Sequence, residues 1–180
     1  MAKTVLTDSE LLVLGLVAEM PRHGYELEQV IDQRGMREWT QIAFSSIYFV
    51  LGKLENKGLI KSAKPASAKS KKSFQLTALG KKTLVNQTLH ALRSVRPNYS
   101  PLLMGMMHWP TLTKSQALDA LSARKEAVAQ ELCRLSDIQF QQQPLPDYME
   151  SMFDFSIGQL NAEAEWIAAT LDYMQNKLWD

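Results

Sequence analysis

The chain has 180 residues, of which 46% are hydrophobic, and a formal net charge of +1 at pH 7. This is enough apolar material to bury a core in one or two small domains. The longest apolar run, residues 11–18, is too short to cross a bilayer, and no signal peptide is visible, so we expect a cytoplasmic protein. One cysteine excludes an internal disulfide or a cysteine metal cluster, and the common motifs of hydrolases, metalloproteases and phosphate loops do not occur. We therefore expect neither an enzyme nor a bound cofactor or metal.

The near-neutral net charge conceals two oppositely charged halves. Residues 45–85 contain nine lysines and a single acid, Glu55, a local net charge of +8. Residues 91–180 contain seven basic and eleven acidic residues, a net charge of −4. This asymmetry indicates that the first half meets a polyanion and the second half meets protein.

Two helices are predicted before residue 36. Thr7 and Glu10 have the spacing of a capping box, and residues 11–17 are apolar nearly all round, which predicts a first helix buried on several sides. A second amphipathic helix is predicted over residues 25–33, and Gly35 closes it.

A third helix is predicted to have two different faces. Its apolar residues recur at intervals of three and four and so share one face, and Gly58 follows as a helix end. The buried face consists of Ile47, Val50, Leu51 and Leu54. The opposite face and its flank carry Ser45, Ser46, Tyr48, Phe49 and Lys53.

A lysine-rich hairpin follows the third helix. Residues 59–60 and 74–76 resemble two short strands, and three helices followed by such a wing is the order of a winged helix-turn-helix. In that fold the third helix enters the major groove of DNA and the wing lies along the phosphates. The alternative is that these lysines belong to a solvated surface loop and make no contact with DNA. We predict that Ser45, Ser46, Phe49 and Lys53 face the bases, that Tyr48 anchors a phosphate, and that Lys69, Lys71 and Lys72 add sequence-independent affinity.

The same segments resemble the PadR family of bacterial transcription regulators. The resemblance lies in LLVLGLVAEMPRHGYELEQVI at residues 11–31, SSIYFVLGKLENKGLI at residues 45–60 and FQLTALGKK at residues 74–82. It implies a winged-helix DNA reader followed by a helical dimerisation domain. Members of this family are mostly repressors, some are activators, and several respond to small aromatic or amphipathic effectors. Phe74 departs from the family pattern, which usually has tyrosine there, and the wing is longer and richer in alanine and serine.

A domain boundary is predicted after a fourth helix. Thr77 is a candidate N-cap for a helix over residues 78–95, and the Arg-Pro-Asn sequence at residues 96–98 breaks it. We therefore predict a winged helix-turn-helix domain over residues 1–95 and an α-helical domain over residues 96–180. The predicted fold class is mainly α with a small β wing.

The last helix has an apolar stripe with an average spacing of 3.5 residues, the period of a coiled-coil seam. We predict that this stripe forms a homodimer, since a dimer would present two recognition helices to a palindromic site. The alternative is a helix that packs within its own chain. The predicted dimerisation residues are Phe153, Ile157, Leu160, Ile167, Leu171, Met174 and Leu178.

Aromatic and methionine residues cluster in the second half. Such side chains suit an adaptable pocket for a flat apolar effector, although they also suit an ordinary core. The candidate effector residues are Tyr99, Met106, Trp109 and Trp166.

The sequence thus favours a dimeric, DNA-binding transcriptional regulator, more often a repressor than an activator in the family it resembles. Two alternatives stay open. In the first, the winged helix binds another protein and no DNA. In the second, the chain binds small aromatic molecules through its second half.

Overall fold

The computed structural model describes residues 5–40, 46–62, 72–97 and 99–176. The chain divides into two compact units, residues 1–97 and 98–180. Four of the predicted site residues lie outside the described residues, namely Ser45, Lys69, Lys71 and Leu178.

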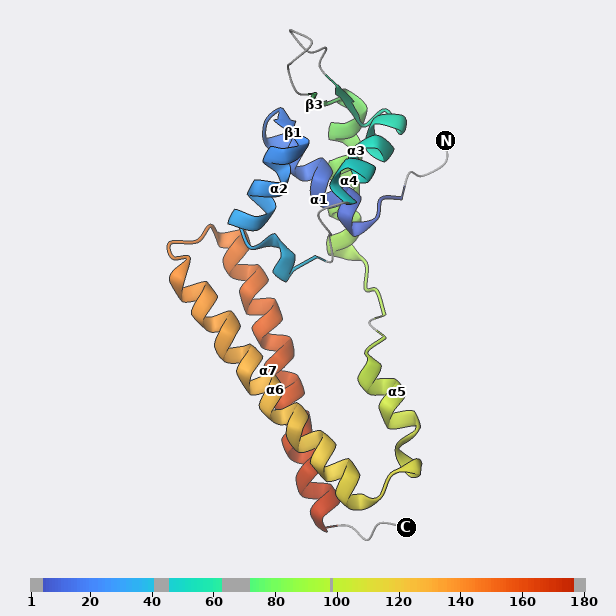
Figure 1. Ribbon diagram of the computed structural model, residues 1–180, viewed down its shortest axis with the longest axis vertical. Helices are drawn as coiled ribbons and strands as arrows, with labels where there is room; N and C mark the ends of the chain where they lie inside the picture. The colour runs from blue at the N-terminus through green and yellow to red at the C-terminus, as the bar shows by residue number, and fades with distance from the viewer. Residues whose placement is uncertain (1–4, 41–45, 63–71, 98, 177–180) are drawn as a thin grey trace. The chain divides into compact units, whose positions relative to one another are not determined.

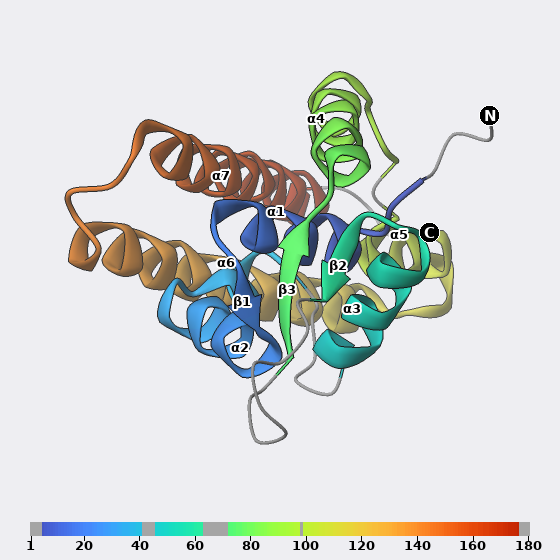
Figure 2. The same ribbon diagram turned by 90° about the horizontal axis from the view of Figure 1, so that it is seen from above.

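The first unit is mainly helical and has a small antiparallel sheet, which confirms the predicted fold class. The strand order is β1-β3-β2, so the sheet has three strands where two were predicted (Figure 2). Strand β1 was missed because it has only two residues and therefore no period to detect. The elements are α1 (Asp8–Glu19), β1 (Arg22–His23), α2 (Gly24–Gln33), the 3₁₀ turn η1 (Met36–Glu38), α3 (Ser46–Asn56), β2 (Ile60–Ser62), β3 (Ser73–Leu76) and α4 (Ala78–Arg93) (Figure 1).

Helix α1 lies at the centre of this unit and packs against α3, α4 and β3. The predicted capping box is confirmed: the Glu10 amide donates to Thr7 Oγ1 at 3.2 Å, and the Thr7 amide donates to a Glu10 carboxylate oxygen at 2.9 Å. All four residues predicted for the inner face of α3 are buried, and they join α1 and α2 residues in one core. This core fixes which face of α3 is left for solvent.

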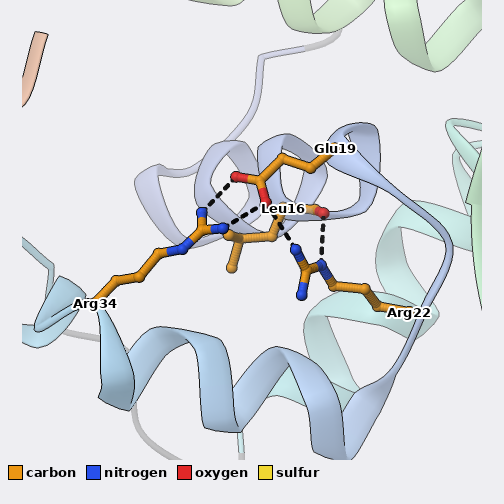
Figure 3. A network of polar contacts seen from close by, with 4 residues as sticks. All are labelled: Leu16, Glu19, Arg22 and Arg34. Atoms are coloured by element: carbon orange, nitrogen blue, oxygen red, sulfur yellow. Dashed lines mark hydrogen bonds and ion pairs between the residues drawn. The ribbon is translucent and has the colours of Figure 1, made fainter. Parts of the chain in front are cut away.

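A polar network ties the end of α1 to the residues on either side of α2 (Figure 3). Two nitrogens of the Arg34 guanidinium donate to the two Glu19 carboxylate oxygens at 2.6 and 2.9 Å. Arg22 donates to the Leu16 carbonyl oxygen at 3.3 Å and to Glu19 at 2.8 Å. Both arginines hold the pKa of Glu19 below its ordinary value, the Arg34 hydrogen bonds most strongly. The paired guanidinium groups therefore fix β1 and α2 onto α1 by charge-assisted hydrogen bonds.

The second unit is all helical among its described residues. It consists of α5 (Pro101–Met107), the 3₁₀ turn η2 (Trp109–Thr111), α6 (Lys114–Gln141) and α7 (Asp147–Asn176). The long helices α6 and α7 lie side by side as a hairpin (Figure 1). None of the helices in the described segments has both the length and the hydropathy that a membrane span requires.

The predicted coiled-coil stripe of α7 packs within its own chain. Ile167, Leu171 and Met174 are buried against Ala117, Leu121 and Val128 of α6. Phe153 is also buried, while Ile157 and Leu160 are half-buried. Three of the predicted dimerisation residues are thus covered by α6 of the same chain (Figure 1), as in the alternative of a helix that packs within its own chain, and a contact of the stripe with a second chain stays a prediction.

Candidate nucleic-acid interface

The outer face of α3 is exposed, as predicted. Tyr48 and Phe49 are 58% and 64% exposed, although both are large aromatic residues, and Lys53 one turn later is also exposed. The Lys53 ammonium lies 4.3 Å from the centre of the Phe49 ring, a cation–π contact. Ser46 is half-buried at the first turn of the helix. An apolar ring and a cation side by side match a thymine methyl and an acceptor on guanine or phosphate.

Tyr48 is held in place by the start of α2. A Cβ atom added to Gly24 would lie only 2.6 Å from Cε1 of the Tyr48 ring, so the ring covers a backbone that has no side chain. Gly24 is therefore a positioning residue for Tyr48. The sequence pattern distinguishes Gly24 only as part of the HGYEL motif.

The base of the wing is fixed by the third helix. Strands β2 and β3 pair antiparallel, with Ile60 opposite Leu76 and Ser62 opposite Phe74. Glu55, in the last turn of α3, accepts a hydrogen bond from the Ser62 amide at 3.1 Å and forms an ion pair with Lys72 at 2.8 Å. The hydrogen bond from Lys72, followed by those from the Ser62 side chain and amide, holds the pKa of Glu55 below its ordinary value. In the sequence, Glu55 stands out only as the single acid of the basic segment, and nothing there indicates its two partners.

The lysines of the basic segment have different environments. Lys57 donates both to Glu10 Oε1 at 2.7 Å and to Glu10 Oε2 at 2.9 Å, so its charge compensates a buried carboxylate. Lys72 is 52% exposed in its side chain but pairs with Glu55. Within the described segments, Lys53, Lys61, Lys81 and Lys82 are exposed and form no ion pair. The net charge of +8 thus overstates the positive charge that is free for a partner.

A cavity in the second unit contains two of the four candidate effector residues. Met106 and Trp109 line a mostly apolar space of about 250 Å³ between α5, η2 and α6, with Leu121 and Arg124 on the α6 side. Arg124 Nε donates to Glu163 at 2.5 Å. Tyr99 is exposed, and Trp166 packs against the α6–α7 core, so neither lines this cavity. Arg124 was missed because a single charge in a helix carries no sequence signal of its own.

The described residues include no group of three or more histidine, cysteine, aspartate or glutamate side chains placed to hold a metal ion. Cys133 is exposed, with its sulfur 3.9 Å from Asp137 Oδ2. A cysteine on a helix with an apolar stripe is expected to be a small buried hydrophobe, but the stripe of α6 faces α7 and leaves Cys133 on the other side.

A helix with a buried inner face, an exposed outer face and a lysine-bearing wing beside it defines a winged helix-turn-helix DNA-binding domain. Residues 13–86 match the model of the transcriptional regulator PadR-like family. This match covers the greater part of the first unit, residues 1–97, and confirms the resemblance to the PadR family seen in the sequence.

Solved structures share the fold of this chain. PadR of Bacillus subtilis in complex with operator DNA is 18% identical, with a TM-score of 0.72 over 92% of this chain and 98% of that protein. The same protein in complex with p-coumaric acid gives 19% identity and a TM-score of 0.74, covering 93% and 98%. The PadR-like regulator BC1756 of Bacillus cereus gives 20% identity and a TM-score of 0.67, covering 95% and 100%. Comparison with curated protein sequences found no match.

Proposed function

We propose that this PadR-family regulator is a repressor that binds a palindromic operator as a homodimer. The observation that carries this proposal is the outer face of α3, where Phe49 and Lys53 are exposed beside the wing. Bacillus subtilis PadR, which has the same fold, was solved on operator DNA. Repression needs only occupancy of the operator, whereas activation needs a further surface for the transcription machinery, so we favour repression.

Sequence preference is assigned to the face of α3 and general affinity to the wing. Ser46 offers a hydroxyl to base edges, Phe49 a ring to a thymine methyl, and Lys53 a cation to guanine or phosphate. Tyr48, whose ring is fixed on Gly24, directs its hydroxyl to a phosphate. Lys69, Lys71 and Lys72 add contacts that do not depend on sequence. Six such contacts in a dimer correspond to a salt slope of about five.

The test is binding to a labelled duplex from the region upstream of the protein's own gene, measured at several salt concentrations beside a scrambled duplex. We expect preference for the native duplex and a steep salt dependence. S46A and F49A should remove the preference, while alanine at the three wing lysines should weaken binding to both duplexes alike. Preference that survives S46A and F49A would contradict the assignment of α3. No binding at low salt would instead favour the rival function, a winged helix that recognises protein.

A second stripe on α7 is the surface that we propose for the dimer. Tyr148, Met152 and Phe155 lie at intervals of four and three on the side of the helix turned away from the buried stripe, and Tyr173 lies on the same side near the other end of the helix. All four are exposed, and such apolar rows on a surface mark contacts between proteins. Sedimentation of the F155A variant at micromolar concentration should show more monomer than the wild type. A control, F140A, removes an equally large exposed ring from α6 and should leave the dimer intact.

The cavity beside Trp109 is the site that we propose for an effector. Its volume of about 250 Å³ and apolar lining suit a single aromatic ring, and Arg124 at its edge suits an attached carboxylate. Bacillus subtilis PadR, solved with p-coumaric acid, suggests the first compound to try. Aromatic acids should raise the melting temperature of the wild type but not of R124M, and should release DNA from the wild type. Stabilisation without any DNA binding would favour the third alternative, a protein that binds small aromatic molecules.

A further inference from the structure

Glu55 is the single acidic residue in the basic segment of residues 45–85. It lies in the last turn of α3, two residues after Lys53, and its side chain is 31% exposed. A carboxylate at this place adds negative charge to the surface that is proposed to face the phosphates of DNA. Repulsion between this carboxylate and the phosphates would weaken DNA binding. The contacts that Glu55 makes within the free protein explain why an acid is nevertheless found at this position.

The two carboxylate oxygens of Glu55 hold the two sides of the wing. Oε1 accepts from the amide of Ser62, the last residue of β2, at 3.1 Å. Oε2 pairs with the ammonium of Lys72, directly before β3, at 2.8 Å. The Lys72 ammonium also lies 5.2 Å from the centre of the Phe74 ring. The Glu55 side chain of α3 is thus bonded to the last residue of β2 and to the residue directly before β3, at the base of the wing.

The Lys72 contact has a consequence for DNA binding. An ammonium that pairs with a carboxylate has less charge to offer to a phosphate, and moving it to the phosphate leaves the carboxylate to take up a cation from solution. Both effects reduce the net release of counterions on which protein–DNA affinity depends. The Ser62 contact is a hydrogen bond that a neutral amide donates to Glu55, and it is unaffected by this exchange.

We propose that Glu55 is a positioning residue that fixes the base of the wing and competes with DNA phosphate for Lys72, and so limits the sequence-independent affinity of the domain. This inference rests on the proposed function, because it concerns the same DNA interface. Glu55 thereby lowers the affinity of the domain for DNA of any sequence. The preference for an operator comes from the face of α3 and is left unchanged.

The test is the variant E55Q in the full-length chain. Glutamine keeps a carbonyl oxygen for the Ser62 amide but removes the charge that holds Lys72. We expect E55Q to bind the upstream and the scrambled duplex about two- to fivefold more tightly per subunit. The salt slope should become steeper by up to about 0.9 per subunit, the value for one more phosphate contact. The ratio of the two affinities should stay as in the wild type.

Two controls separate the ion pair from a change of net charge. E131Q makes the same charge change at another ion-paired glutamate, which binds Arg134 at 2.6 Å in the second unit, and should leave both duplex affinities as they are. In a K72A background, E55Q should no longer steepen the salt slope. An E55A variant, which also removes the bond to Ser62, should show faster hydrogen exchange at the Ser62 amide than E55Q does.

The outcomes are distinguishable. An E55Q protein with the wild-type salt slope, or one whose gain is the same with and without Lys72, overturns this inference while the DNA-binding function stands. A wild-type protein that binds neither duplex at low salt overturns the proposed function itself. An equal gain from E131Q would assign the effect to net charge and would also overturn the role of Glu55.

Discussion

At the scale of single residues, Gly80 shows how a backbone contact can require glycine without an unusual dihedral angle. A Cβ atom on Gly80 would lie 2.0 Å from the Leu59 carbonyl oxygen. That oxygen is held in place because it accepts hydrogen bonds from both the amide and the hydroxyl of Thr77, each at 3.0 Å. The N-terminal turn of α4 is therefore pressed against the chain that leads into the wing.

We predict that G80A lowers the free energy of unfolding by about 2–3 kcal/mol, because the methyl group must push α4 away from the backbone at Leu59. The matched control is G15A in α1, where an added Cβ meets nothing within 4 Å. There the gain in helix propensity should raise stability by about 0.5–1 kcal/mol. Urea unfolding followed by circular dichroism measures both. Equal effects of the two substitutions would refute the contact at Leu59.

Glu10 couples stability to pH. Its side chain is almost fully buried, and burial raises its pKa, but the bonds from Lys57 and the Thr7 amide outweigh this effect and leave the pKa below the ordinary value of 4.5. A carboxyl with a lowered pKa in the folded state stabilises the protein above pH 4.5, and this contribution disappears as the pH falls through the lowered value. E10Q should therefore cost about 1–3 kcal/mol at pH 7 and less at about pH 3.5. An equal loss at both pH values would contradict the ion pair.

At the scale of elements, the sequence predicted those helices and strands that are long enough to show a hydrophobic period. The inner face of α3 was predicted residue by residue, and the long apolar stripe of α7 was recognised as well. Strand β1 was missed, and α5 was seen only as an aromatic cluster, because two and seven residues carry too little periodicity. Local spacing fixes these faces, whereas short elements depend on contacts with distant residues.

The apolar stripe of α7 was recognised from sequence, and its packing against α6 is one of the two alternatives that the spacing left open. A spacing of 3.5 residues demands a neighbouring helix and does not say whether that helix belongs to the same chain. Besides a shorter apolar row that contains Phe155, α7 carries the unbroken row that contains Ile167, and only the unbroken row has a period that can be read from the sequence. The structure buries that row and leaves the row of Phe155 exposed.

The two rows should respond differently to truncation. I167A removes a fully buried side chain from the α6–α7 core and should lower the free energy of unfolding by about 2–5 kcal/mol. F155A removes a ring that is 68% exposed and should change the unfolding of a dilute sample by less than about 0.5 kcal/mol. Thermal unfolding at low and high protein concentration measures both effects. A loss of stability in F155A at every concentration would mean that Phe155 packs within the chain.

At the scale of the whole molecule, the opposite charges of the two halves are the strongest sequence signal of function. The basic half carries the winged helix, and the acidic half forms the helical unit. The sequence predicted the exposed face of α3 well because alternation of buried and exposed positions is local. It could not predict that Lys57 faces Glu10, 47 positions away, or that Lys72 faces Glu55, because only folding brings these residues together.

The lysines of the basic half should therefore fall into two functional groups. Lys81 and Lys82 are exposed on α4 and should contact DNA phosphates. The double variant K81A/K82A should therefore reduce the salt slope by about 0.9 for each phosphate that is no longer neutralised. Its free energy of unfolding should equal that of the wild type. Lys57 compensates buried Glu10, so K57A should lower the free energy of unfolding by about 1–3 kcal/mol and leave the salt slope as it is. DNA titrations across a salt series and urea unfolding of the same preparations compare the two. A reduced slope in K57A would show that the Glu10 pair opens on DNA, and the whole charge of +8 would then be available to the polyanion after all.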